Sequence, residues 1–363
     1  MNSLSPITAA EAAPFSLASA PGHSGAVFSA AQNLLPRLER GQRVDAEILR
    51  AAMEAAFGAS DASGAWDWKL AYDACEAATV LFLRKYGKVL FRKGGSPAAI
   101  LPMVAKIAGL LPTHTRRSVE SETFQQFSTP IPLALAAATA ASITPADRVL
   151  EPSTGTGLLA ILGEIAGATL LLNELADTRA GLLSSLFPAV SVTRFDAAQI
   201  DDHLDPAAIP SVVLMNPPFS ALANVSGRVA DTAYRHIASA LARLTDGGRL
   251  VATTGASFAP DAPAWRDAFA RLQERGRVVF TAAIDGAVYA KHGTTIDTRL
   301  TVIDKTPADD PGMFPTSPGI APDVATLLGW VGTHVPARLP MTPMVPPPAA
   351  SAPVLSLIHI SEP

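Results

Sequence analysis

The feature that most constrains the fold is a regular alternation, through the middle of the chain, of short apolar runs with longer helical stretches. Strands that alternate with helices of ten or more residues predict βαβ units and a parallel sheet covered on both faces, which is an α/β fold of three layers. The expected strands are Arg148–Leu150, Thr169–Asn173, Val190–Arg194, Ser211–Met215, Arg249–Thr254 and Val278–Ala283. A further strand, Thr294–Lys305, follows too closely for a crossover helix, so an antiparallel pair should make the sheet mixed but mostly parallel.

The region before these strands has a helical pattern. Apolar residues recur at helical spacing from about Ala31 to Leu111, and Gly94 and Gly95 interrupt the pattern. We therefore expect a flexible N-terminus over 1–30, a helical subdomain over 31–116 and the α/β domain over 117–305.

The end of the chain is rich in proline. This composition predicts a semi-rigid linker over 306–354, with at most one short helix near Pro322–Val331. The last residues, 355–363, resemble the translation of a sequencing adapter, so we expect the natural protein to continue past about Val354.

Composition excludes several classes of protein. Hydrophobic residues at 48% and charged residues at 17% describe a globular chain of 363 residues, without an uninterrupted apolar run long enough for a membrane span. The single cysteine, Cys75, excludes an internal disulfide and fits a reducing, cytoplasmic compartment. The seven histidines show no paired Cys/His spacing, so no metal site is expected.

The charge does not settle whether the protein binds nucleic acid. A net charge of −4 is mildly unfavourable, but a local basic face can be hidden in a net value. Five basic residues form a candidate patch, which either contacts nucleic acid or is the solvated end of a helix: Arg84, Lys85, Lys88, Arg92 and Lys93.

The strongest local motif runs from Arg148 to Ala160, where an apolar strand meets a carboxylate and then a glycine turn. Gly155 and Gly157 leave room for a ligand close to the backbone. Such a turn also suits a dinucleotide, but Glu151 before it favours a cationic amino-acid cofactor over a pyrophosphate.

Two more acids follow the next strands. Glu174 ends the second strand, where a carboxylate can accept hydrogen bonds from ribose hydroxyls. Asp196 follows the third strand and either accepts a hydrogen bond from an adenine amine or caps a helix.

The decisive motif is Asn-Pro-Pro-Phe at 216–219, after the fourth strand. Prolines cannot continue a central strand, so the chain must leave the sheet after Asn216. The side-chain oxygen of Asn216 and the carbonyl of Pro217 can then accept hydrogens from one amine, and Phe219 can stack on a planar substrate.

These motifs resemble those of class I S-adenosylmethionine-dependent methyltransferases, in the amino-methylating group that carries Asn-Pro-Pro-aromatic. The segment Gln125–Pro130 resembles an additional cofactor motif of the DNA adenine subgroup, and Ser153 replaces the first glycine of the loop, as it often does there. The resemblance implies a Rossmann-like fold and the catalytic residues Asn216, Pro217, Pro218 and Phe219. It also implies contacts with S-adenosylmethionine by Phe127, Thr129, Pro130, Glu151, Ser153, Gly155, Gly157, Glu174 and Asp196.

The implied reaction is methylation of the exocyclic amine of adenine in DNA. The same loop serves other planar nitrogens, such as a guanine amine in RNA or a glutamine amide in protein, and a non-catalytic binding module is a third possibility. Residues from about Trp68 to Val331 also resemble the methylase region that precedes a strawberry-notch-like helicase in bacterial mobile-element proteins, which implies a linked helicase beyond this chain. Lys291 and His292 lie in a polar turn that contacts phosphate or base, or is a plain hairpin loop.

Overall fold

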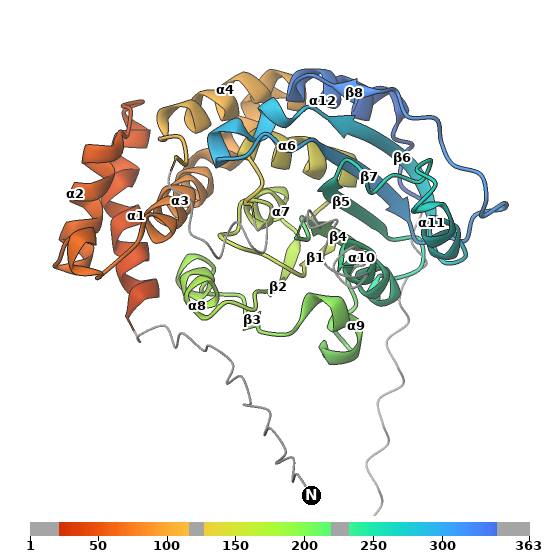
Figure 1. Ribbon diagram of the computed structural model, residues 1–363, viewed down its shortest axis with the longest axis horizontal. Helices are drawn as coiled ribbons and strands as arrows, with labels where there is room; N and C mark the ends of the chain where they lie inside the picture. Colours follow the sequence, from red (N-terminus) through yellow and green to blue (C-terminus); the bar gives the residue numbers. More distant parts are fainter. Residues whose placement is uncertain (1–21, 116–126, 219–231, 340–363) are drawn as a thin grey trace, which may run out of the picture.

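The protein was analysed as a computed structural model that describes residues 22–115, 127–218 and 232–339. Its centre is one eight-stranded sheet with helices on both faces (Figure 1). The strands are β1 (Arg148–Glu151), β2 (Thr169–Asn173), β3 (Val192–Thr193), β4 (Val212–Met215), β5 (Arg249–Gly255), β6 (Arg277–Ile284), β7 (Thr298–Asp304) and β8 (Ile320–Ala321).

The strand order is β3-β2-β1-β4-β5-β7-β6-β8. The strands from β3 to β5 pair in parallel, whereas β7 lies antiparallel to both β5 and β6. The predicted mixed, mostly parallel sheet of a Rossmann-like fold is therefore confirmed. The order reverses between β1 and β4, and in such sheets ligands bind at that switch point, beyond the carboxyl ends of the strands.

Successive residues of each central strand face opposite layers, as the pleat requires. In β4, Val212 and Leu214 join one apolar core, and Val213 and Met215 join the other. Both cores are apolar because a parallel strand is covered on both faces, which explains why these strands appear in the sequence as continuous apolar runs.

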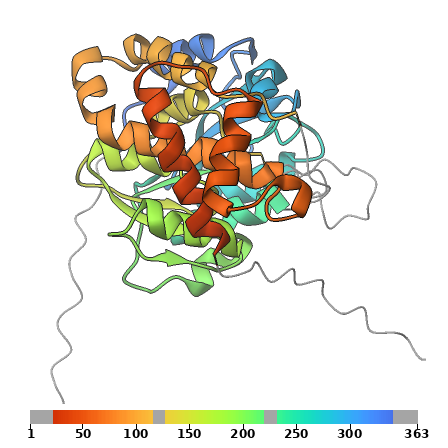
Figure 2. The same cartoon turned by 90° about the vertical axis from the view of Figure 1, so that its left-hand side faces the viewer.

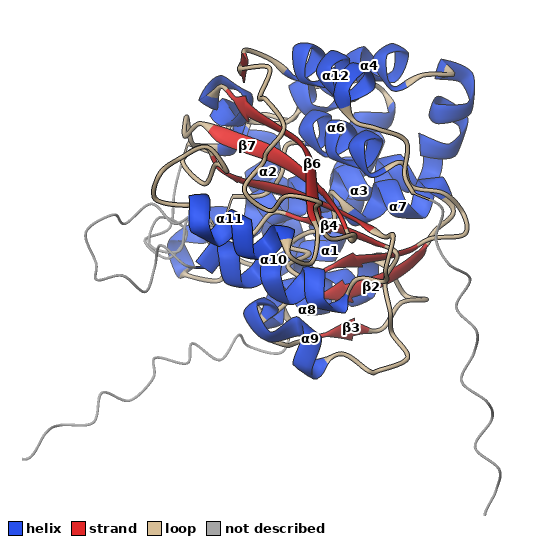
Figure 3. Cartoon of the chain, turned by 90° about the vertical axis from the view of Figure 1, so that its right-hand side faces the viewer, coloured by secondary structure: helices blue, strands red, loops and turns tan. Residues whose placement is uncertain are grey.

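The helices form the two outer layers (Figure 3). One face of the sheet is covered by α6 (Ile131–Ala141), α7 (Ala160–Ala166), α8 (Asp177–Leu186) and α12 (Val324–His334). The opposite face is covered by α9 (Ile200–His203), α10 (Thr232–Arg243) and α11 (Arg266–Gln273). Three short 3₁₀ helices connect elements: η1 (Asp61–Ser63), η2 (Ala197–Gln199) and η3 (Gly286–His292).

In the described part of the chain, four N-terminal helices pack on the side of the sheet that carries α6, α7, α8 and α12 (Figure 2). They are α1 (His23–Glu39), α2 (Ala46–Phe57), α3 (Trp68–Gly94) and α4 (Pro97–Leu110). Asp45, Asp67 and Ser96 cap α2, α3 and α4 by accepting hydrogen bonds from backbone amides. Within the described residues, no helix combines the length and the hydropathy that crossing a bilayer would need.

Two expectations for the N-terminal region were wrong. Helix α1 begins at His23, within the segment expected to be flexible, because its alanines and valine pack as a helical face in the core. The segment expected to form a helical subdomain is helical, but it does not have a core of its own, since α3 contacts α1, α7 and α8 and shares one continuous hydrophobic core with the sheet.

The expected linker after residue 305 was also wrong over residues 306–339, although the one short helix expected near Pro322–Val331 is present as α12. Strand β8 adds to the edge of the sheet beside β6, and α12 packs on α6 and α4. Ala321, Leu327 and Val331 are buried, so the prolines of this segment connect structural elements instead of separating domains. Residues 340–363, including the expected adapter-derived tail, lie outside the described residues.

Candidate active site

A cavity of about 220 Å³ opens at the carboxyl edge of the sheet, where β1, β2 and β4 end. Most of the residues predicted from the sequence line it. They are Phe127, Thr129, Glu151, Ser153, Gly155, Glu174, Asp196, Asn216, Pro217 and Pro218. Phe127 and Asn216, which are 89 positions apart, thus meet at one site, because parallel strands end at the same edge.

Two predicted residues lie elsewhere, and a third falls outside the described residues. Pro130 caps the start of α6 and lines a neighbouring cavity. Gly157 belongs to the glycine loop but does not line the cavity, and a Cβ added to it would come within 2.6 Å of the Phe187 ring. Phe219 lies outside the described residues.

The glycine loop is held in shape by hydrogen bonds to β2. The backbone amide of Thr154 donates to the Asn173 carbonyl at 3.0 Å, and that of Gly155 donates to Oε2 of Glu174 at 2.7 Å. Gly155 and Gly157 have φ values of +59° and +88°, which favour glycine. A Cβ at Gly155 would meet no atom within 4 Å, so this position leaves free space on the cavity side.

Glu151 is a buried carboxylate in need of a cation or donor. It is 2% exposed, and its Oε2 has no hydrogen-bond partner among the described residues. Burial, helped by the nearby Glu174 carboxylate, raises the pKa of Glu151 well above its usual value. A ligand that carries a positive charge would offset the free-energy cost of burying the ionised carboxylate.

Glu174 and Asp196 are placed as expected but already have backbone partners. Glu174 accepts from Gly155 and, through Oε1, from the amide of Ala176 at 2.9 Å. Asp196 accepts from the amide of Ala198 and so caps η2, as the alternative interpretation required. Each carboxylate also lines the cavity, so the capping role and a ligand contact are compatible.

Asn216 follows β4 directly and is oriented by one hydrogen bond. Its Nδ2 donates to the carbonyl of Phe127 at 2.7 Å, and Asn216 is one of the residues that line the cavity. Oδ1 is buried without a partner among the described residues. Tyr289 of η3 lies beside Asn216 and Thr129, and burial raises the pKa of its hydroxyl.

The residues that line this cavity without having been predicted from the sequence include Asn173, Arg179, Phe195 and His236. Asn173 connects three strand ends, since its Nδ2 donates to the carbonyls of Pro152 and Phe195 and its Oδ1 accepts from the amide of Phe195. Its position beside Glu174 was a usable signal. Arg179 and His236 come from α8 and α10, where nothing in the helical pattern marked them.

Arg179 forms a buried ion pair with Asp73 of α3 at 2.8 Å. Glu76, which follows Asp73 on α3, accepts a hydrogen bond from Oγ1 of Thr156 in the glycine loop at 2.6 Å. Helix α3 therefore supports the cavity wall at two points. His236 adds a buried Nδ1 without a partner among the described residues, and burial lowers its pKa.

Basic residues that were candidates for nucleic-acid contact form contacts with other residues of the chain. Arg84 pairs with Glu164 at 2.8 Å and Lys85 with Glu39 at 2.6 Å, so these two members of the candidate patch have acidic partners. Lys291 donates to the carbonyls of Ala108, Gly109 and Leu111 at the end of α4, each at 3.1 Å. Lys291 thus caps a helix.

Comparisons with known proteins give structural likenesses only. No protein-family model matches the chain, and no curated protein does. A solved structure titled TrmN from Thermus thermophilus is 20% identical with a TM-score of 0.36, over 48% of this chain and 49% of that one. A modification subunit of a putative type I restriction enzyme from Vibrio vulnificus is 16% identical with a TM-score of 0.44, over 65% and 62%.

A putative class I S-adenosylmethionine-dependent methyltransferase from Listeria monocytogenes is 12% identical with a TM-score of 0.47, over 86% of this chain and 99% of that one. The chain spans about half the length of the Thermus protein and under two thirds of the Vibrio protein. These likenesses are distant, and the assignment of the fold rests on the strand order and the two covered faces of the sheet.

Proposed function

We propose that this protein transfers the methyl group of S-adenosylmethionine to the exocyclic amine of adenine in DNA. One observation carries the proposal: Glu151 and Asn216 line one cavity from the ends of adjacent strands, and each has a buried polar atom, Oε2 and Oδ1, without a partner among the described residues. Glu151 calls for a positively charged group, and Asn216 calls for a hydrogen-bond donor. A methyl donor with an ammonium group and an amine substrate supply both.

The cavity residues fit the parts of the cofactor. Glu151 is placed to receive the ammonium group, because a buried carboxylate without a partner is stabilised by a cation. Glu174 is placed to accept hydrogen bonds from ribose hydroxyls, and Asp196 from the adenine amine. Phe195 offers an aromatic ring beside Asp196, and Phe127 and Thr129 border the cavity on the side of Asn216.

Asn216 and Pro217 account for the chemistry on the substrate. When bound, S-adenosylmethionine supplies a methyl group on a cationic sulfur, which leaves as the neutral thioether S-adenosylhomocysteine. An amine on an aromatic ring is a weak nucleophile because its lone pair is delocalised. Oδ1 of Asn216 and the carbonyl of Pro217 would accept its two hydrogens and favour the pyramidal nitrogen, which frees the lone pair and prepares one proton to leave.

The orientation of Asn216 supports this role. Because one N–H of Nδ2 is bound by the Phe127 carbonyl, the amide group is restrained, and Oδ1 would be the acceptor for the substrate amine. Adenine as the target follows the resemblance of the Gln125–Pro130 segment. In duplex DNA the base would have to leave the stack to reach Asn216.

The proposal is tested with labelled S-adenosylmethionine and unmethylated DNA, followed by nucleoside analysis. We expect methylated adenine from the unaltered chain and none from Asn216→Ala, which should still bind the cofactor. Glu174→Ala should instead weaken cofactor binding. Equal loss of binding in both variants would contradict this division of roles.

Parallel pools of RNA and protein identify the substrate. Label in RNA or in a glutamine amide would move the proposal to those targets while keeping the role of Asn216. Cofactor binding without transfer to any pool would favour a non-catalytic module. The resemblance to methylase regions that precede a helicase also leads us to propose a helicase partner in the same polypeptide, which the genomic locus would reveal.

A further inference from the structure

Glu76, His114 and His292 form a second cluster outside the proposed active site. They come from α3, from the segment after α4 and from the end of η3, and each offers one ligand atom. These three atoms all lie within 4.8 Å of one another. Segments separated by up to 216 positions in the chain thus place two imidazoles and a carboxylate together.

The cluster is shielded from solvent and incompletely satisfied. The side chains of Glu76 and His292 are 5% and 14% exposed, and Nδ1 of His292 is buried without a hydrogen-bond partner among the described residues. Oε1 of Glu76 lies 3.6 Å from that nitrogen, which is longer than a hydrogen bond. A nitrogen and an oxygen that face one another at this distance leave room for an atom that binds both.

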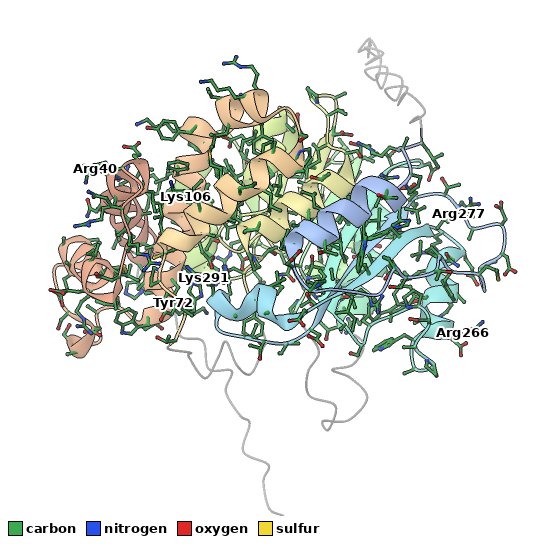
Figure 4. All side chains as sticks on the ribbon, turned by 90° about the horizontal axis from the view of Figure 1, so that it is seen from above. Arg40, Tyr72, Lys106, Arg266, Arg277 and Lys291 are labelled. Atoms are coloured by element: carbon green, nitrogen blue, oxygen red, sulfur yellow. The ribbon has the colours of Figure 1, made fainter. Side chains whose placement is uncertain are left out.

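Contacts around the cluster hold these side chains in place. The Tyr72 ring stacks on His114 with centroids 4.0 Å apart, and the His114 amide donates to the Lys291 carbonyl at 2.8 Å. Tyr72 and Lys291 accordingly lie together in Figure 4. Oγ1 of Thr156 donates to Oε2 of Glu76, which directs Oε1 toward His292. Metal ligands in proteins are oriented by outer contacts of this kind.

The three side chains offer atoms that transition metals bind, one carboxylate oxygen and two imidazole nitrogens. Cys75 lies nearby, but burial raises the pKa of its thiol, which disfavours the thiolate that metals bind.

The cluster borders a cavity of about 250 Å³, which gives an ion access and leaves space for a water ligand. This cavity is separate from the one at the strand ends, and Leu158 borders both. Thr156 links the two sites, since it lies in the glycine loop and bonds Glu76.

We propose that Glu76, His114 and His292 bind one divalent transition-metal ion, with zinc the best match. Two imidazoles and one carboxylate are a common zinc ligand set, whereas magnesium and calcium prefer oxygen alone. Zinc bonds of about 2.1 Å place ligand atoms about 3.4 Å apart, so binding draws the three atoms together by roughly 1.4 Å at most. The ion would connect α3 with η3 and would fix the position of the Glu76 carboxylate, which accepts the hydrogen bond from Thr156 of the glycine loop.

The test measures zinc directly. The full chain is stripped with chelator and titrated with zinc chloride, with metal content and thermal unfolding as readouts. We expect one zinc ion per chain and a higher melting temperature, with no rise from magnesium chloride. Glu76→Gln, His114→Gln and His292→Gln should each weaken zinc binding at least 10-fold, and Thr156→Val about 10-fold as an outer contact.

His334→Gln, at the exposed end of α12, is the matched control and should bind zinc as the unaltered chain does. Zinc affinity unchanged by the His114 and His292 substitutions would overturn the proposal. If those variants do not fold, cobalt chloride added to the unaltered chain decides. Visible absorption of four- or five-coordinate cobalt supports the site, and octahedral, water-like cobalt absorption contradicts it.

Discussion

At the scale of single residues, Glu151 gives the clearest pH dependence. Because its pKa is raised in the folded protein, the folded chain keeps a proton on Glu151 at pH values where the unfolded chain releases it. The contribution of Glu151 to stability is therefore present at low pH and is lost as pH rises through the raised pKa. A cationic cofactor binds the ionised form. We therefore expect cofactor affinity, and the cofactor-induced rise in melting temperature, to increase with pH through that pKa and then to level off.

Glu151→Gln should remove this dependence and weaken cofactor binding by roughly 10- to 100-fold, because a charge-assisted hydrogen bond contributes about 1.5–3 kcal/mol. Glu164→Gln is the matched control, since Glu164 pairs with Arg84 away from the cavity. Titration calorimetry at several pH values measures both variants. A pH profile shared by Glu151→Gln and the unaltered chain would contradict the assignment.

Asp196 and Asn216 show what single positions in the sequence could predict. Each follows a strand, and the edge of a parallel sheet brings strand ends together, so their place in one cavity was predictable. His236 and Arg179 were not, because a helix exposes many positions and only packing decides which one faces the cavity. Glu76, His114 and His292 have no regular spacing in the sequence, and only the folded chain brings them together.

At the scale of elements, the two glycines of the loop separate stability from binding. Gly157→Ala forces a Cβ against the Phe187 ring at a φ of +88°, and we expect a loss of about 1–3 kcal/mol in the free energy of unfolding. Gly155→Ala meets no neighbour, so it costs only about 1–2 kcal/mol of backbone strain but fills space beside the cofactor. Denaturant unfolding and cofactor titration distinguish them.

The relation expected between these variants is specific. Gly155→Ala should lose proportionally more affinity than stability, and Gly157→Ala more stability than affinity. The reverse pattern would mean that the ligand approaches the loop at Gly157. The sequence motif named both glycines as cofactor contacts, and the burial of Gly157 against Phe187 depends on a helix that the motif does not include.

At the scale of the whole molecule, the chain after residue 305 contacts the start of the central strand β1 through a buried ion pair. Arg338 contacts Asp147 at 2.7 Å, with side chains 11% and 0% exposed. Burial raises the pKa of Asp147, and Arg338 and Ser211 outweigh that effect and lower it. The contribution of this carboxylate to stability is therefore present above its unfolded pKa and is lost as pH falls through the lowered value.

Arg338→Met should cost about 3–5 kcal/mol of unfolding free energy, since it leaves Asp147 buried without its partner. Arg277→Met, which breaks an exposed pair with Asp309, should cost less than about 1 kcal/mol. Thermal unfolding from about pH 2 to 8 compares them, and the two melting curves should converge as the pH falls below the unfolded pKa of Asp147, about 3.9. Equal losses would show that the Arg338 pair has no structural role.

Proline content led to the wrong expectation for this segment because composition reports backbone stiffness, whereas burial depends on which faces meet. Chain removal tests the distinction. Ending the protein at Lys305 removes β8 and α12, exposes the apolar faces of α6 and α4, and deprives Asp147 of Arg338. We expect that shortened chain to aggregate or to lose cooperative unfolding, whereas a chain that ends at Leu339 should keep the full melting temperature. A soluble, cooperatively folded 1–305 chain would restore the interpretation of 306–339 as a linker.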